Sequence, residues 1–197
     1  IANTTLKYYG SSGPLINAVG ATSARKLLSI SDMSLDGGSA TGTAYGLRLG
    51  HNYRSFGALQ RVRIDYFPGP GIGFFGDSWN MSFHDVYMSF NADASVGTAL
   101  YIDAAVTGLL AIDWFNLQLE NNGFTGSSVA GGMELPNSTI INWNFYGGVW
   151  EGNYGDCEVR FTDCSGVHIY GTYLESNSAH AINGMVLQGN TRATISG

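Results

Sequence analysis

Acidic and amide side chains recur along this sequence at the ends of short apolar segments. They are, in chain order, Asp36, Asp65, Asn91, Glu120, Glu151 and Glu175. Each follows an apolar residue that we expect to point inward, so the polar side chain should point outward. On neighbouring parallel strands their carboxyls would lie about 5 Å apart, and on alternate strands about 10 Å. Glycoside hydrolysis uses carboxyl pairs at ~5–5.5 Å or ~6.5–9.5 Å. Glu120, Glu151 and Glu175 are therefore candidate catalytic residues.

Asp113 is a fourth candidate, because it stands beside an aromatic residue, Trp114. A purely structural role is the alternative for all four acids. Asn121 and Gly152 follow two of them directly, and carboxylates near such residues often accept hydrogen bonds from turn N–H groups. A motif that recurs in every repeat is structural in most of its copies.

Aromatic residues make up 13% of the chain and suggest a surface on which sugar rings could stack. Trp114 and Trp143 occupy similar places in successive repeats, and Tyr146 follows shortly after. If these side chains are exposed, they form a substrate-binding platform. If they are buried, they form an aromatic stack in the core. The sequence leaves both readings open.

Metal and cofactor sites find little support in the sequence. Acids such as Asp93, Asp103 and Asp113 are too dispersed for a calcium site, and no His or Cys residues have zinc spacing. We therefore expect no metal and no cofactor. Cys157 shares the alternation of Val159 and Phe161, which predicts a thiol in the core rather than a disulfide.

The elements that position these residues repeat every ~28 residues. Three series of apolar residues recur. The first contains apolar residues at strand ends, the second contains apolar-x-apolar pairs, and the third contains an apolar residue that comes shortly after each strand end. The first series is Ile30, Phe56, Phe83, Ile112, Ile141, Ile169 and Ile195. The second is Leu47/Leu49, Ile72/Phe74, Leu100/Ile102, Met133/Leu135, Val159/Phe161 and Met185/Leu187. The third is Leu35, Ile64, Phe90, Leu119, Trp150 and Leu174.

This pattern predicts an all-β, right-handed parallel β-helix, with three short strands per coil and about seven coils. We expect residues 1–197 to form one domain, in which residues 1–29 are a weaker initial coil. The last predicted strand, Thr194–Gly197, has no polar cap after it. Because solenoids need capped ends, we expect the chain to be a fragment of a longer protein.

Charge and hydropathy narrow the functional classes. The net charge is -6 with no basic stripe, so we expect no nucleic-acid partner. No segment approaches the ~20 apolar residues of a membrane span, so we expect no membrane insertion.

Four segments resemble the coils of pectate-lyase-like right-handed β-helix proteins. They are ISDMSLDGG (30–38), LENNG (119–123), WEGNYG (150–155) and YLESN (173–177). The likeness is greatest to the β-helix body of bacteriophage tailspikes that degrade capsular polysaccharide. It implies an extracellular or virion-borne homotrimer that hydrolyses, lyses or deacetylates polysaccharide. Some lyases of this kind use an arginine as the base, for which Arg48, Arg63 and Arg160 are candidates, and we include Arg160 among the substrate-binding residues.

These observations lead to two functional hypotheses. In the first, the protein is an enzyme that binds and depolymerises a bacterial capsular or extracellular polysaccharide, as a hydrolase or a lyase. In the second, it is a non-catalytic adhesin or structural appendage of a virion, in which the polar ladders only hold the coils together. An active site would show acids, an arginine and exposed aromatic rings converging on one face.

Overall fold

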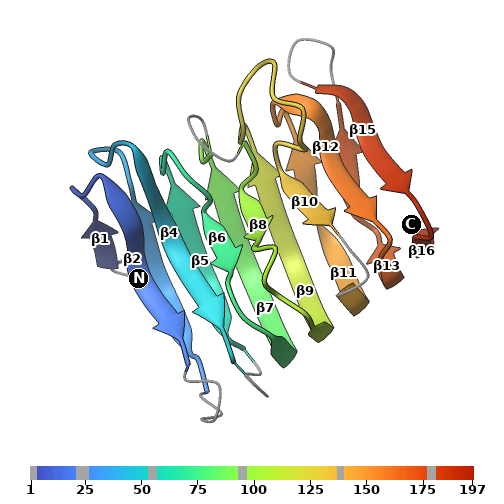
Figure 1. Cartoon of the computed structure of the whole chain (residues 1–197), viewed down its shortest axis with the longest axis horizontal. Helices are drawn as coiled ribbons and strands as arrows, with labels where there is room; N and C mark the ends of the chain where they lie inside the picture. Colours follow the sequence, from blue (N-terminus) through green and yellow to red (C-terminus); the bar gives the residue numbers. More distant parts are fainter. Residues whose placement is uncertain (1–3, 21–26, 53–56, 93–96, 137–139, 177–180) are drawn as a thin grey trace.

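In a computed structural model, the described residues fold into stacked parallel coils with no helix. The structure describes residues 4–20, 27–52, 57–92, 97–136, 140–176 and 181–197. Coils follow one another along the longest axis, from β1 and β2 at one end to β15 and β16 at the other (Figure 1). The solenoid has about six coils, slightly fewer than the sequence predicts. Phe56, a member of the predicted repeat, lies outside the described residues.

Two parallel sheets form the walls of the solenoid. The first sheet contains β1 (Thr4–Lys7), β3 (Ile30–Asp36), β5 (Leu59–Asp65), β7 (Ser78–Ser89), β9 (Leu109–Glu120), β11 (Ile140–Glu151), β13 (Ser165–Tyr170) and β16 (Arg192–Ser196), with β14 (Tyr173–Glu175) beside β11. The second contains β2 (Ser12–Val19), β4 (Thr43–Gly50), β6 (Ile72–Phe74), β8 (Leu100–Ile102), β10 (Met133–Pro136), β12 (Gly155–Thr162) and β15 (Ala181–Gln188).

The long strands of the first sheet are bent at residues with positive φ. In β7 these are Asn80 (54°) and Asp85 (52°), and Phe90 (54°) follows directly after the strand. Equivalent bends at Ala111, Asn116 and Asn121 shape the coil of β9. The predicted first and third strands of a coil therefore run together as one bent strand, and the second sheet supplies the remaining strand.

Apolar side chains of successive coils stack in columns inside the solenoid. The second-sheet pairs predicted from the sequence are in register, as in Leu47↔Ile72↔Leu100. The described members of these columns in β4 to β12 are buried, with exposed fractions of 0–4%. Each such side chain contributes roughly 1.5–3 kcal/mol when it leaves water. This continuous apolar core holds the walls that carry the outward-facing residues.

Both cysteines lie in this core as free thiols. Burial raises the pKa of Cys157 and of Cys164 to about 12, so almost no reactive thiolate is present at neutral pH. We expect neither thiol to react with a disulfide reagent in the native protein within minutes, whereas both should react at once in denaturant. A spectrophotometric thiol assay checks this, and rapid labelling of the native protein would show that the core opens.

Candidate functional site

A row of acids follows the outer face of the first sheet at the ends of its strands. In register, the row consists of Asp36, Asp65, Ser89, Glu120, Glu151 and Glu175. The prediction of Asn91 as a member of this row is wrong, because Ser89 holds that position. Glu120, Glu151 and Glu175 stand on successive strands, as the sequence predicts. We call this set the acid row.

Most acid-row carboxylates accept a hydrogen bond from an outward-facing side chain two positions earlier. The donor lies either on the same strand or at the corresponding position of the neighbouring strand. Arg63 pairs with Asp65 and lies over the ring of Tyr87, with its guanidinium carbon 4.6 Å from the ring centre. The Tyr87 hydroxyl donates to Glu120 at 3.0 Å, and burial together with this bond raises the Tyr87 pKa.

At the far end of the row, the Tyr173 hydroxyl donates to Glu175. Within the described part of the chain, the Glu151 carboxylate makes no hydrogen bond or ion pair. Glu151 is therefore free to meet a ligand, whereas Glu120 is held in one orientation.

Asp113 does not join the acid row. It lies on the same strand as Glu120, but the chain bends between them at Asn116, whose φ is 57°. Its carboxylate accepts a hydrogen bond from Asn144 Nδ2 at 2.7 Å on the neighbouring strand. The structure thus separates Asp113 from the other three candidate acids.

Trp114 and Trp143 are buried, so the expectation that they form a sugar platform is wrong. Both have exposed fractions of 0%. Nor do they occupy equivalent positions, because Trp114 pairs in register with Phe145 and Trp143 pairs with Ile112. Trp114 stacks on the core ring of Phe83, with centroids 4.2 Å apart. The structure therefore supports the alternative interpretation, in which these residues form an aromatic stack in the core.

Tyr146 lies outside the core, in a column of stacked rings on the outer face of the first sheet. The column is His84, Phe115, Tyr146 and Tyr170, with centroid separations of 4.6, 4.8 and 5.3 Å. Tyr146 is 39% exposed. Within such a column the faces of the inner rings cover one another, so Phe115 and Tyr146 present mainly edges to solvent. The column is therefore poorly suited to stacking on a sugar ring.

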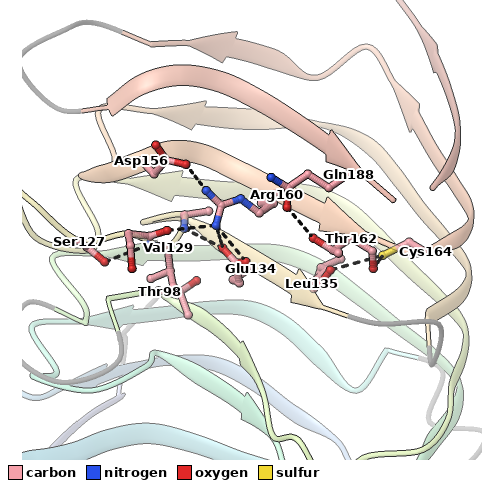
Figure 2. A network of polar contacts seen from close by, with 12 residues as sticks. Thr98, Ser127, Val129, Glu134, Leu135, Asp156, Arg160, Thr162, Cys164 and Gln188 are labelled. Atoms are coloured by element: carbon pink, nitrogen blue, oxygen red, sulfur yellow. Dashed lines mark hydrogen bonds and ion pairs between the residues drawn. The ribbon is translucent and has the colours of Figure 1, made fainter. Parts of the chain in front are cut away.

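Arg160 is part of an ion-pair network on the second sheet, away from the acid row. Figure 2 shows its guanidinium between Asp156 and Glu134. Arg160 Nη1 also donates to the carbonyl of Ser128 at 3.1 Å, and Glu134 accepts from the amide of Ala130 at 2.8 Å. With only 9% of its surface exposed, Arg160 secures the segment before β10. Arg63 is instead the candidate arginine that lies among the acids.

A hollow of about 390 Å³ opens at the corner that follows the acid row. Its lining includes a pair of stacked rings, Tyr66 and Phe90, whose centroids are 5.1 Å apart with planes inclined by 4°. Tyr66 is 49% exposed and Phe90 is 44% exposed. The lining residues are Gly37, Gly38, Ala40, Tyr66, Pro68, Phe90, Asn121, Gly123 and Tyr154.

The two residues that carry these rings have an unfavourable backbone conformation. Tyr66 has φ of 62° and Phe90 has φ of 54°, a region that bulky residues rarely adopt. At the same corner, later coils have Asn121 and Gly152, which are residue types suited to positive φ. Burial does not explain the aromatic residues, since both are exposed. Strain of this kind is concentrated at functional positions.

A ladder of buried asparagines supports the hollow from within. Asn91, Asn122 and Asn153 each follow a corner residue, and each is 0% exposed. Asn91 Nδ2 donates to Asn122 Oδ1 at 3.1 Å, and Asn122 Nδ2 donates to Asn153 Oδ1 at 2.9 Å. The ladder ends on the buried carboxylate of Glu158, which accepts from Asn153. The constant spacing of 31 residues between these asparagines is the sequence signal that could have revealed the ladder.

Glu158 makes stability depend on pH. Burial raises its pKa from the ordinary 4.5 to about 7, although the Asn153 bonds oppose this shift. The folded state therefore binds the proton more tightly than the unfolded chain does. Its contribution to stability is full below pH ~4.5 and is lost as pH rises towards 7.

Glu158→Gln should remove this dependence. Between pH 5 and 8 we expect the wild type to lose about 2.5 kcal/mol relative to the variant. Urea unfolding of both proteins across this range measures the difference. Parallel stability curves for the two proteins would contradict the role given to Glu158.

In comparisons with family models, curated proteins and solved structures, none matches the chain. The likeness to pectate-lyase-like proteins therefore rests on the coil motifs and the parallel solenoid alone. Within the described ranges, no group of three or more His, Cys, Asp or Glu side chains is placed to hold a metal ion. The same ranges contain no helix long and apolar enough to cross a membrane.

Proposed function

We propose that this protein binds a polysaccharide, with one or two sugar residues seated in the hollow beside the acid row. The observation that carries the proposal is the Tyr66–Phe90 pair, which is exposed, strained and part of the lining of the hollow. Sugar rings have apolar faces that pack on aromatic rings, while their hydroxyls bond amides, hydroxyls and carboxylates. Asn121 and Tyr154 in the lining, together with the neighbouring acids, offer such polar partners.

Replacing the two rings should remove binding without unfolding the protein. In Tyr66→Asn/Phe90→Asn, asparagine suits positive φ, which offsets the lost stacking, so stability should change by less than about 1 kcal/mol. Binding to the polysaccharide that the wild type retains best should weaken at least tenfold. Affinity electrophoresis through a panel of capsular and plant polysaccharides measures this loss.

Tyr146→Asn is the matched control, because it changes an exposed ring of the aromatic column. We expect it to bind as the wild type does. If this variant lost binding while Tyr66→Asn/Phe90→Asn retained it, the site would lie on the column and the proposed location would be wrong.

Hydrolysis of the bound chain is a second function, favoured by the placement of Glu120 and Glu151. They stand in register on neighbouring strands, whose separation of about 4.8 Å is close to the carboxyl spacing of retaining glycosidases. Asn121 and Gly152 follow them at the corner of the hollow. In this scheme Glu120, held by Tyr87, acts as nucleophile, and the free Glu151 protonates the leaving oxygen and later activates water.

The resemblance to tailspike β-helices extends the proposal to the whole protein. We propose a homotrimer that is secreted or carried on a virion and acts on a bacterial surface polysaccharide. A non-catalytic adhesin with the same binding hollow is the competing form of this proposal. The two forms differ in one measurable respect, which is the release of new reducing ends.

A further inference from the structure

Among the described residues, the lining of the hollow contains no charged side chain, whereas the row beside it is acidic. The lining consists of glycine, alanine, proline, asparagine and aromatic residues. Asp36, Asp65, Glu120 and Glu151 border it on the outer face of the first sheet. A ligand in the hollow therefore meets apolar ring faces, uncharged hydrogen-bonding groups and a negative edge.

The nearby cations offset only part of this negative edge, because none of them pairs with Glu120 or Glu151. On β1, β3, β5, β7, β9 and β11, the Lys and Arg residues are Lys7, Arg61 and Arg63. Each is paired with a carboxylate: Lys7 with Asp36 at 3.6 Å, Arg61 with Asp32 at 2.5 Å, and Arg63 with Asp65. A carboxylate or sulfate on a sugar would find no unpaired cation on these strands and would face the uncompensated charges of Glu120 and Glu151.

We infer that the hollow binds uncharged sugar residues and excludes uronates, sialic acids and sulfated sugars. This inference rests on the proposed function and narrows its ligand class. Its physical basis is the stacked Tyr66–Phe90 pair, which takes the apolar face of a sugar ring, next to an acid row that repels anions. Because contacts with an uncharged ring involve no ion pairs, their strength should depend little on salt.

A glycan array that holds neutral and acidic oligosaccharides tests this assignment. We expect the wild type to bind neutral glycans, with signals at least tenfold above those of uronate-bearing or sulfated analogues of the same backbone. Tyr66→Asn/Phe90→Asn should lose the neutral signals. Glu120→Gln/Glu151→Gln should gain signal on acidic glycans, whereas Glu175→Gln, three strands beyond the coils that carry the paired rings, should not.

The outcomes separate this inference from the proposed function. Preferential binding of acidic glycans that depends on Tyr66 and Phe90 would overturn the inference and leave the proposed function standing. Absence of binding to every glycan by a folded wild type would overturn both. Neutral binding that survives the loss of both rings would also overturn both, because the ligand would then lie elsewhere.

Discussion

Glu151→Gln should lower the release of reducing ends from the bound polysaccharide by about 100- to 10,000-fold, the range typical for loss of a general acid or base. Glutamine keeps the shape of the side chain but neither donates a carboxyl proton nor accepts one. Glu120→Gln should lower the release of reducing ends by a similar factor, because it removes the proposed nucleophile. Binding should remain within about threefold of the wild type, since the ring pair is unchanged. Reducing-end assays and affinity electrophoresis measure the two effects separately.

Glu175→Gln is the control for the acid row. Glu175 is exposed, bonds the Tyr173 hydroxyl and lies next to Glu151 in register. This variant should retain most of the activity. If the wild type binds polysaccharide but releases no reducing ends, the adhesin form of the proposal holds and the acids are structural. If Glu151→Gln is as active as the wild type, Glu151 takes no part in catalysis.

Asn122→Ala should reduce the free energy of unfolding by about 3 kcal/mol or more. Asn122 Nδ2 donates to the Met88 carbonyl at 2.9 Å, and its Oδ1 accepts from the Asn91 amide at 3.1 Å. Alanine leaves both buried backbone groups without these partners, at a cost of about 1–3 kcal/mol each. Urea denaturation followed by tryptophan fluorescence measures the loss.

Asn144→Ala separates the effect of the ladder from that of losing any asparagine. Asn144 is half-buried and its side chain bonds the Asp113 carboxylate, so its loss should cost less than about 1 kcal/mol. Equal destabilisation by the two variants would show that the ladder has no special importance. A two-state transition in both variants is needed for the comparison.

The period of the apolar pairs was sufficient to predict the parallel solenoid and the register of the second sheet. Those pairs stack as expected because inward and outward positions alternate strictly there. The outward placement of Glu120, Glu151 and Glu175 follows from the same alternation. For Glu120 and Glu151 the preceding residues, Leu119 and Trp150, are buried in the core, whereas Leu174 before Glu175 is 36% exposed.

The hollow could not be predicted, because its aromatic residues break the rule that apolar side chains in the repeat point into the core. Phe90 was assigned to the core on its apolar character, but Met88 holds that core position and Phe90 lies outside at 44% exposure. Ile141, a member of the first apolar series, is likewise exposed, at 45%. The positive φ of Phe90 turns its ring outward, and a bulky residue gives no sign of such a bend in the sequence. Errors of this kind are expected at functional, strained positions.

The most direct test of the central claim is a crystal structure of the protein with the oligosaccharide that binds best on the array. We predict that a sugar ring packs on the outer face of Tyr66 or Phe90 within about 4 Å, with its hydroxyls towards Asn121 and Tyr154. A sugar on the column of His84, Phe115, Tyr146 and Tyr170, with the hollow left empty, would contradict the account.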